Sequence, residues 1–341
     1  MKVTINDVAK YAGVSIKTVS RVTNHEPQVK QSTIDKVNAA IKALDYQPNQ
    51  SARNLASSSS YVIGFVYDNP NAYYIIDMQN GILNACREQG YELLIHPCDA
   101  SSSDICQELT ALVMHTQFAG LVLTPPLSEN PQVLAALDAI GTQYVRIIAA
   151  SELDQQIVAN GLQVLVNDKV GAIAITEHLI QLGHQRIAFI SGDPEHQSTK
   201  ERMDGFLEAL AHHQLTTYPE YLIDGQYNFE SGVAGANRLL SLSPAPTAIV
   251  ACNDEIAAGA LFAARLAGVA IPKQISIVGF EDSPFSRQTW PKLTTVHQPN
   301  QAIAKLATCN LINKCRRREH LDGQMFIPKP ILRDSTAVPI D

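Results

Sequence analysis

The sequence predicts an α/β protein with three parts: a small head of three helices, a short hinge, and a larger body with two parallel sheets. Three observations lead to this prediction. Residues 5–24 form two short helical patterns around a glycine, residues 61–148 alternate apolar strands with helices, and the alternation starts again after residue 165. Such alternation is typical of parallel sheets covered by helices on both faces. We therefore expect two similar subdomains, with a cleft at the carboxyl ends of their strands.

The composition is that of a folded protein with an uneven charge distribution. The chain has 341 residues, of which 45% are hydrophobic and 17% charged, and its net charge is −7. Residues 1–60 hold eight Lys and Arg against four Asp and Glu, whereas the remainder holds 18 against 29. A basic head on an acidic body is expected when only the head meets the phosphates of a nucleic acid.

Three absences predict the cellular setting. The N-terminus has no apolar signal-peptide region, no apolar run is long enough to cross a membrane, and the six cysteines show no zinc spacing. We therefore expect a cytoplasmic protein with reduced thiols, no membrane association, and neither a metal nor another cofactor.

The head begins with a predicted helix-turn-helix at residues 5–24. Thr4 is expected to cap the first helix, with Asp7 three residues later as in a capping box. Gly13 breaks the pattern, and Ser15 is expected to cap a second helix from residue 16 to about residue 22. Two short helices joined by a tight turn with glycine are typical of a DNA-reading motif.

The second helix presents side chains that suit the major groove. Lys17 and Arg21 face outward and can donate to guanine edges, and Ile16 can contact a thymine methyl group. An amphipathic helix pair in a protein core is the alternative, but the caps, the turn glycine and the outward cations coincide here. We expect DNA contacts from Thr4, Ser15, Ile16, Lys17, Thr18, Arg21 and Asn24.

A third helix is expected to complete the head. Residues 32–35 have the composition of a helix start. The apolar residues that follow share one helix face: Ile34, Val37, Ala40, Ile41 and Leu44. Pro48 ends the pattern, because the residue before a proline avoids the helical conformation. The predicted DNA-binding domain is therefore residues 1–48.

These motifs resemble the start of the lactose-repressor/galactose-repressor family of bacterial transcription factors. Residues 181–190, 252–254, 275–280 and 293–299 also look like motifs of this family, so the resemblance covers nearly the whole chain. It implies a hinge helix and a periplasmic-binding-protein-like body that binds a sugar-type effector.

The hinge and linker are predicted at residues 49–60. Residues 50–56 are too few for a helix that is stable alone, and four serines follow. A plain linker is the alternative. The sequence Ala52-Arg53-Asn54-Leu55 matches the family's hinge, which implies a helix that forms on DNA. The resemblance thus implies DNA contacts for Ala52 and Arg53, and for Leu55 as a wedge in the minor groove.

The body, residues 61–341, is expected to alternate strands and helices throughout. We predict strands at 61–67, 91–95, 120–124, 144–148, 186–190, 248–251, 275–279 and 294–296. We predict helices at 78–89, 106–116, 132–140, 170–181, 201–213 and 255–266. The expected N-subdomain is about 61–164 and 298–326, and the expected C-subdomain is about 165–297 and 327–341.

Candidate effector-binding residues lie near predicted strand ends. Asn71, Tyr73 and Tyr74 follow the first strand and suit a hydroxyl-rich ligand, although a solvated turn explains them equally well. Tyr227 can stack on the face of a sugar. The resemblance also implies an effector contact for Tyr74.

Three further candidates follow from the family motifs. Arg202 stands where the family has an arginine that reaches the ligand; a surface arginine in a salt bridge is the alternative. Asn253 stands where family members have an asparagine for ligand hydroxyls. Glu281 departs from the family, which usually has Asp there, and its extra methylene extends the carboxylate.

The predicted function is sequence-specific DNA binding by a transcriptional regulator, and we expect it to act as a repressor. We expect a homodimer or higher assembly on a palindromic double-stranded operator, controlled by a sugar or glycoside effector. A nucleoside or purine effector, or a corepressor, is the alternative. A doubly wound enzyme and a transport-type sugar-binding protein are disfavoured, because no nucleophile–base set, no GxGxxG after a strand and no signal peptide is found.

Overall fold

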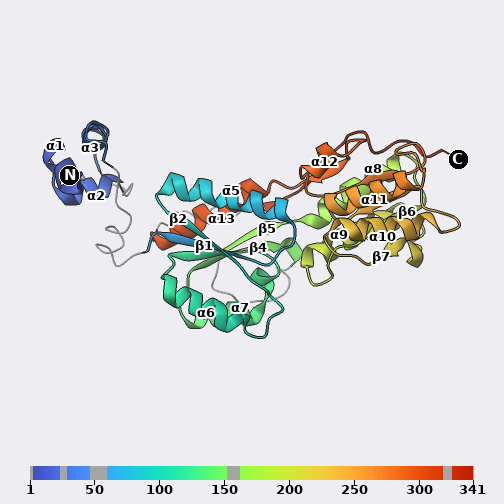
Figure 1. The fold of residues 1–341 in the computed structure, drawn as a ribbon, viewed down its shortest axis with the longest axis horizontal. Coiled ribbons are helices and arrows are strands. Elements are labelled where there is room, and N and C mark those ends of the chain that lie inside the picture. Colours follow the sequence, from blue (N-terminus) through green and yellow to red (C-terminus); the bar gives the residue numbers. More distant parts are fainter. Residues whose placement is uncertain (1–2, 24–28, 47–59, 152–161, 318–324, 341) are drawn as a thin grey trace.

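The computed structural model describes residues 3–23, 29–46, 60–151, 162–317 and 325–340. The helical head is followed by a body with two α/β subdomains, each with its own sheet and its own hydrophobic core (Figure 1). The fold class predicted from the sequence is confirmed.

The head contains the three predicted helices, α1 (Ile5–Ala12), α2 (Ile16–Thr23) and α3 (Gln31–Ala43). Their fully buried residues are Val8, Val19, Val37 and Ala40. The Asp7 carboxylate accepts hydrogen bonds from the Thr4 backbone N–H (2.9 Å) and hydroxyl (2.7 Å), and Gly13 ends α1 at a φ of 67°. Ser15 Oγ accepts from the Thr18 N–H at 3.1 Å, so both predicted helix starts are present.

The start of α3 differs from the prediction. The residue before the helix is Lys30, which makes no side-chain capping bond, and residue 32 already lies in the first turn. The predicted apolar face is nevertheless correct, since its residues pack into the core of the head.

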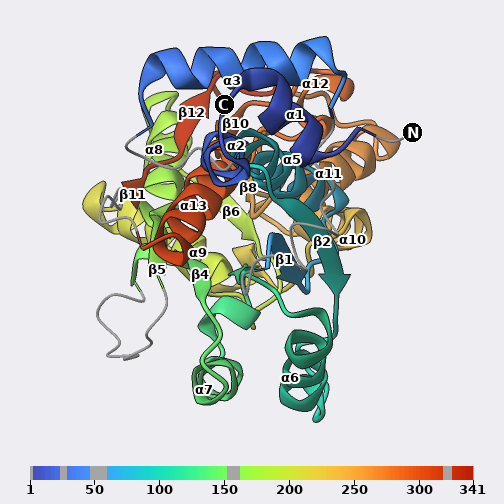
Figure 2. The same cartoon turned by 90° about the vertical axis from the view of Figure 1, so that its left-hand side faces the viewer.

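The first sheet of the body has six strands, all paired in parallel, in the order β11-β5-β4-β3-β1-β2. Its strands are β1 (Val62–Tyr67), β2 (Glu92–Pro97), β3 (Gly120–Leu123), β4 (Tyr144–Ala149), β5 (Leu162–Val166) and β11 (Met325–Phe326). Helices α5 (Ala72–Gln89) and α13 (Asn300–Cys315) cover one face, and α6 (Ile105–Thr116) and α7 (Pro131–Ala139) cover the other (Figure 2).

The second sheet has four parallel strands in the order β7-β6-β8-β9. They are β6 (Ile187–Ile190), β7 (Leu222–Ile223), β8 (Ala248–Ala251) and β9 (Ser276–Val278). The helices around this sheet are α8 (Asp168–Gln181), α9 (Gln197–His212), α10 (Phe229–Leu240) and α11 (Asp254–Leu266). A separate antiparallel pair, β10 (Thr295–His297) with β12 (Lys329–Ile331), lies beside α8, and α12 (Phe285–Gln288) is a single short turn.

Two helices begin well before their predicted starts, and several elements were not predicted; one of the early helices is α9, which begins at Gln197 instead of residue 201. Helix α5 begins at Ala72, six residues before its predicted start, because the Asn71 side chain caps it. The prediction also lacked α10, α13, β5, β7, β11 and β12. Helix α10 has two glycines, which lower helix propensity, and most of the missing strands have only two or three residues.

The packing of α10 against α11 requires one glycine from each helix, Gly232 of α10 and Gly259 of α11. A Cβ at Gly232 would collide with the Ile256 carbonyl oxygen, and a Cβ at Gly259 would collide with that of Phe229. The two helices therefore approach until their backbones touch. This close approach explains why a segment of low helix propensity is still helical.

We expect Gly232→Ala to lower the free energy of unfolding of the body by about 1–3 kcal/mol, the usual range for overpacking. Denaturant unfolding followed by circular dichroism measures this change. Asn237→Ala, on the exposed side of the same helix, is the matched control and should cause little loss. Equal stability of the Gly232 variant and the parent would show that α10 and α11 can separate freely.

Candidate functional site

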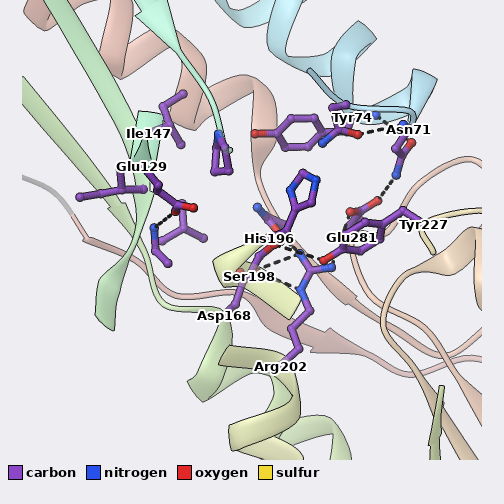
Figure 3. Close-up of a pocket in the computed structure, with 16 residues that line it drawn as sticks. Asn71, Tyr74, Glu129, Ile147, Asp168, His196, Ser198, Arg202, Tyr227 and Glu281 are labelled. Atoms are coloured by element: carbon purple, nitrogen blue, oxygen red, sulfur yellow. Dashed lines mark hydrogen bonds and ion pairs between the residues drawn. The ribbon is translucent and has the colours of Figure 1, made fainter. Parts of the chain in front are cut away.

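A polar pocket lies between the two subdomains of the body, beside the ends of several strands (Figure 3). Its cavity volume is about 50 Å³, and the empty space is about 560 Å³ when the open solvent at its mouth is included. The first subdomain contributes polar groups from Asn71, Tyr74 and Glu129, and the second contributes Asp168, His196, Ser198, Arg202, Tyr227 and Glu281. The apolar part of the lining comes mainly from residues 147–149 in β4.

Asn71 connects the two sides of the pocket. Its Oδ1 accepts hydrogen bonds from the backbone N–H groups of Tyr73 (3.1 Å) and Tyr74 (3.2 Å) at the start of α5. Its Nδ2 donates to Glu281 Oε2 at 2.6 Å. One buried amide thus caps a helix of the first subdomain and binds a carboxylate of the second (Figure 3).

Arg202 lies at the centre of the site and is only 4% exposed, so the surface-arginine alternative is wrong. Its Nε donates to Asp168 Oδ2 (3.0 Å), and its Nη2 donates to Gln298 Oε1 (3.2 Å). Its Nη1 donates to the Cys252 carbonyl oxygen (2.7 Å) and lies 3.7 Å from Glu281 Oε1. Protein groups thus hold the guanidinium fork in place.

The carboxyl groups beside Arg202 are harder to ionise than usual. Burial raises the pKa of Glu281 to about 7, although the Arg202 charge and the Asn71 hydrogen bond lower it in part. Burial also raises the pKa of Asp168, more than Arg202 lowers it. Asp168 Oδ1 has no hydrogen-bond partner among the described residues. A residue that lines the pocket thus has a buried carboxyl oxygen without a hydrogen-bond partner in the described protein.

Tyr227 forms another wall of the pocket and is held by its hydroxyl group. The hydroxyl oxygen lies 2.6 Å from Thr199 Oγ1 and 3.2 Å from Ser198 Oγ. Its ring packs edge to face against His196, with centroids 5.4 Å apart. A side chain at Gly192 would collide with the ring, so this glycine makes room for Tyr227.

The structure brings five of the seven predicted effector residues into the pocket: Asn71, Tyr74, Arg202, Tyr227 and Glu281. Tyr73 does not line it and packs edge to face on Phe285, with ring centroids 5.3 Å apart. Asn253 is fully buried and does not line the pocket either; its Oδ1 accepts from the Ile256 N–H at 2.9 Å and caps α11.

Several pocket residues were missing from the sequence prediction. Asp168 follows β5, a strand that was itself not predicted. His196 belongs to a loop after β6, and Gln298 follows β10 inside one of the family-like motifs. Asp168 and Gln298 lie within two residues of a strand end and His196 lies in the loop that follows one, so the position after a strand was the signal that could have identified them.

The predicted DNA contacts on α2 are accessible. Ile16 is 50% exposed, Lys17 is exposed, and Arg21 is half-buried. Thr4 and Ser15 act as helix caps, and the Thr18 hydroxyl lies 2.8 Å from Ser15 Oγ. The predicted contacts at Asn24, Ala52, Arg53 and Leu55 lie outside the described residues.

Comparison with known proteins identifies the family to which this chain belongs. A family model described as "Bacterial regulatory proteins, lacI family" matches residues 4–49, and one described as "Periplasmic binding protein-like domain" matches residues 176–336. The probable HTH-type transcriptional repressor ExuR of Bacillus subtilis is 33% identical over 316 residues, which is 91% of each chain. The chain belongs to the LacI family.

Further relatives of this LacI-family chain agree with its fold. The HTH-type transcriptional repressor PurR of Aliivibrio salmonicida is 30% identical over 317 residues, 93% of each chain. The lac repressor dimer bound to operator and the anti-inducer ONPF aligns with a TM-score of 0.75 and 26% identity, covering 99% of this chain and 100% of that one. A CelR–cellobiose complex aligns with a TM-score of 0.70 and 25% identity, covering 98% and 100%.

Membership of the LacI family identifies the protein as a DNA-binding transcriptional repressor and not an enzyme. The two disfavoured alternatives, a doubly wound enzyme and a transport-type binding protein, are therefore wrong. In the part of the chain that the structure describes, no helix is both long and apolar enough to cross a bilayer.

Asp254 of this LacI-family protein is a further carboxyl group with a strongly raised pKa, and it does not line the pocket. It is fully buried and accepts hydrogen bonds from the Ser283 N–H (2.6 Å) and the Thr295 hydroxyl. Burial raises its pKa to about 8, although these hydrogen bonds lower it in part. The folded protein therefore retains this proton at a pH where an unfolded chain has released it.

We expect stability to fall as the pH rises from about 4, the ordinary pKa of Asp, to about 8. In this range the folded state binds more protons than the unfolded state, so the free energy of unfolding decreases with pH. Asp254→Asn should make this decrease smaller. Denaturant unfolding at several pH values tests the prediction, with Asp224→Asn as an exposed control. An unchanged slope in the Asp254 variant would mean that this carboxyl group is ionised in the fold.

Proposed function

We propose that this LacI-family repressor binds a palindromic operator as a homodimer in the cytoplasm, and that a small-molecule effector in the described pocket controls it. The lac repressor relative is a dimer bound to operator, which supports the first part. The second part is supported by the polar pocket between the subdomains, since clefts of this type are the usual ligand sites of such folds.

The proposed effector is a sugar or glycoside, and the observation that carries this choice is the acceptor-rich lining. Glu129, Asp168 and Glu281 face a space that contains one guanidinium, Arg202. Asp168 Oδ1 lacks a hydrogen-bond donor among the described residues. Sugar hydroxyls supply hydrogen-bond donors without adding negative charge. An anionic ligand, in contrast, is repelled by these carboxyl groups when they are ionised. The CelR relative was solved with cellobiose, which supports the same class.

A nucleoside or purine is the second candidate. The rings of Tyr74 and Tyr227 line the pocket and offer faces for a planar base. A base also carries N–H donors for the acceptor-rich lining. The two candidates differ in what they present to the tyrosines, so a ligand screen separates them.

A thermal-shift screen of the full chain tests the proposal. Sugars, glycosides and nucleosides are compared with uronates and sugar phosphates at equal concentrations. A ligand that binds the folded state raises the midpoint of unfolding. A neutral sugar or glycoside should give the largest shift; a larger shift from nucleosides would overturn the sugar assignment in favour of the second candidate, and one from anionic sugars would contradict the charge argument.

Effector binding is proposed to act through the contact between Asn71 and Glu281. This hydrogen bond joins the subdomains beside the pocket, so a ligand there changes their relative angle. That angle sets the spacing of the two hinge segments in a dimer. The effector controls DNA binding only through unequal affinity for the two arrangements, commonly worth about 1–3 kcal/mol. We propose that it acts as an inducer, because a sugar that relieves repression is the common arrangement in this family.

Ser198→Trp should fill the pocket and abolish the thermal shift with the identified effector. Ser198 lines the pocket at the start of α9, whereas Arg202 is a poor test residue because its loss leaves Asp168 buried without a cation. Operator binding should persist and should not respond to effector. Lys200→Trp, exposed on the same helix, is the matched control. If calorimetry shows that the Ser198 variant binds the effector as tightly as the parent does, the effector site lies outside this pocket.

Lys17→Ala should relax sequence preference at one base pair in each operator half-site. Lys17 is exposed on α2, whose first residues are proposed to enter the major groove. The loss of discrimination should be about 1–3 kcal/mol for a bidentate contact. Selection from a randomised operator measures it, with Lys10→Ala on α1 as the control. A parental preference would exclude Lys17 from base reading.

Ala52, Arg53 and Leu55 are proposed to be the hinge residues that contact DNA. In this proposal Leu55 is inserted into the minor groove at the operator centre and bends the duplex.

A further inference from the structure

Helices α8 and α9 run side by side from the pocket to the far end of the second subdomain. At the pocket end, Arg202 of α9 binds Asp168 of α8. Farther along, a Cβ at Gly205 would collide with the Lys169 carbonyl oxygen, so the two backbones touch. At the far end, His213 lies beside Glu177. The helices therefore keep a fixed register along their whole contact.

Three metal-ligating side chains meet at this far end. Glu177 belongs to α8, His212 is the last residue of α9, and His213 follows it as the C-cap. One donor atom from each lies within 4.8 Å of the other two. His213 Nε2 is 3.7 Å from Glu177 Oε1, and the two imidazole rings are 5.1 Å apart at 78°. The sequence did not indicate this cluster, because Glu177 is far from the histidine pair along the chain.

The spacing is close to what a transition metal needs. Ligand atoms at about 2.0–2.1 Å from a tetrahedral zinc ion are about 3.3 Å from one another. The Glu177–His213 separation needs only a small adjustment to reach this value, and exposed side chains can adjust by rotation. Water can complete the coordination, because His212 and His213 are both exposed.

A simple ion pair does not account for all three residues. The 3.7 Å separation of His213 and Glu177 is too long for a good hydrogen bond, and His212 has no part in such a pair. The carbonyl groups at the end of α9 also favour a cation at this position. We propose that Glu177, His212 and His213 form a binding site for a divalent transition metal ion of the zinc and nickel class.

The proposed ion connects α8 to α9 at the ends opposite the pocket. Because it binds the folded arrangement of two helices, it raises the stability of the second subdomain. Three of the cysteines are weak competitors for the ion, since burial raises the pKa of Cys86 and Cys98 to about 12 and that of Cys315 to about 11. The site is independent of the effector pocket and does not rest on the proposed function.

Titration of the full chain with NiCl2 in a calorimeter tests the proposal, using protein without a histidine tag. The parent should bind one more equivalent of Ni2+ than His212→Ala/His213→Ala. Loss of even an outer partner of a ligand costs about 10–100-fold in metal affinity, so removal of two ligands should abolish this step. Ni2+ should also raise the unfolding midpoint of the parent more than that of the variant.

Two controls complete the experiment. His115→Ala removes one exposed imidazole on another helix and should leave the titration unchanged. Thermal unfolding without metal checks that the double variant is folded, as expected for exposed positions. The proposal is overturned if the parent shows no Ni2+ binding, or if parent and double variant bind with the same stoichiometry and affinity.

Discussion

The buried Arg202 guanidinium is the interaction on which the pocket depends. It joins the start of α8 through Asp168, the end of β8 through the Cys252 carbonyl oxygen, and the segment after β10 through Gln298. Its charge also lies over the Phe280 ring, 4.0 Å from the centroid. A buried cation without partners is costly, so the elements that supply these partners are held in one arrangement. The pocket is thus formed by elements that satisfy the same charge.

The carboxyl groups around this cation determine what the pocket can accept. Burial raises the pKa of Asp168 and Glu281 more than Arg202 lowers it, so one guanidinium does not fully stabilise two carboxylates here. A ligand with additional negative charge increases this imbalance, whereas a ligand with many hydroxyl groups satisfies acceptors. The electrostatics of the site therefore favour neutral, donor-rich molecules, independently of any relative.

The sequence was most informative where local chemistry determines local structure. Capping residues such as Thr4 and Ser15 predicted the head, and apolar strands that alternate with helices predicted both subdomains. The sequence was least informative where tertiary contacts determine whether an element forms or where a side chain lies. Helix α10 packs closely against α11 through Gly232, and Asp168 is in the pocket because an unpredicted strand precedes it. Asn253 was a reasonable candidate by position, but its amide caps a helix instead of facing the pocket.

The double role of Asn71 restricts which residues can replace it during evolution. Aspartate caps a helix equally well, but it places a second carboxylate against Glu281. Serine caps well too, but its side chain is shorter and cannot reach as far. Glutamine has the reach and the amide but is not a preferred cap. A change in the contact between the subdomains therefore requires simultaneous substitution of Asn71 and Glu281. These two residues should be replaced together during evolution, whereas neighbouring pocket residues can be replaced one at a time.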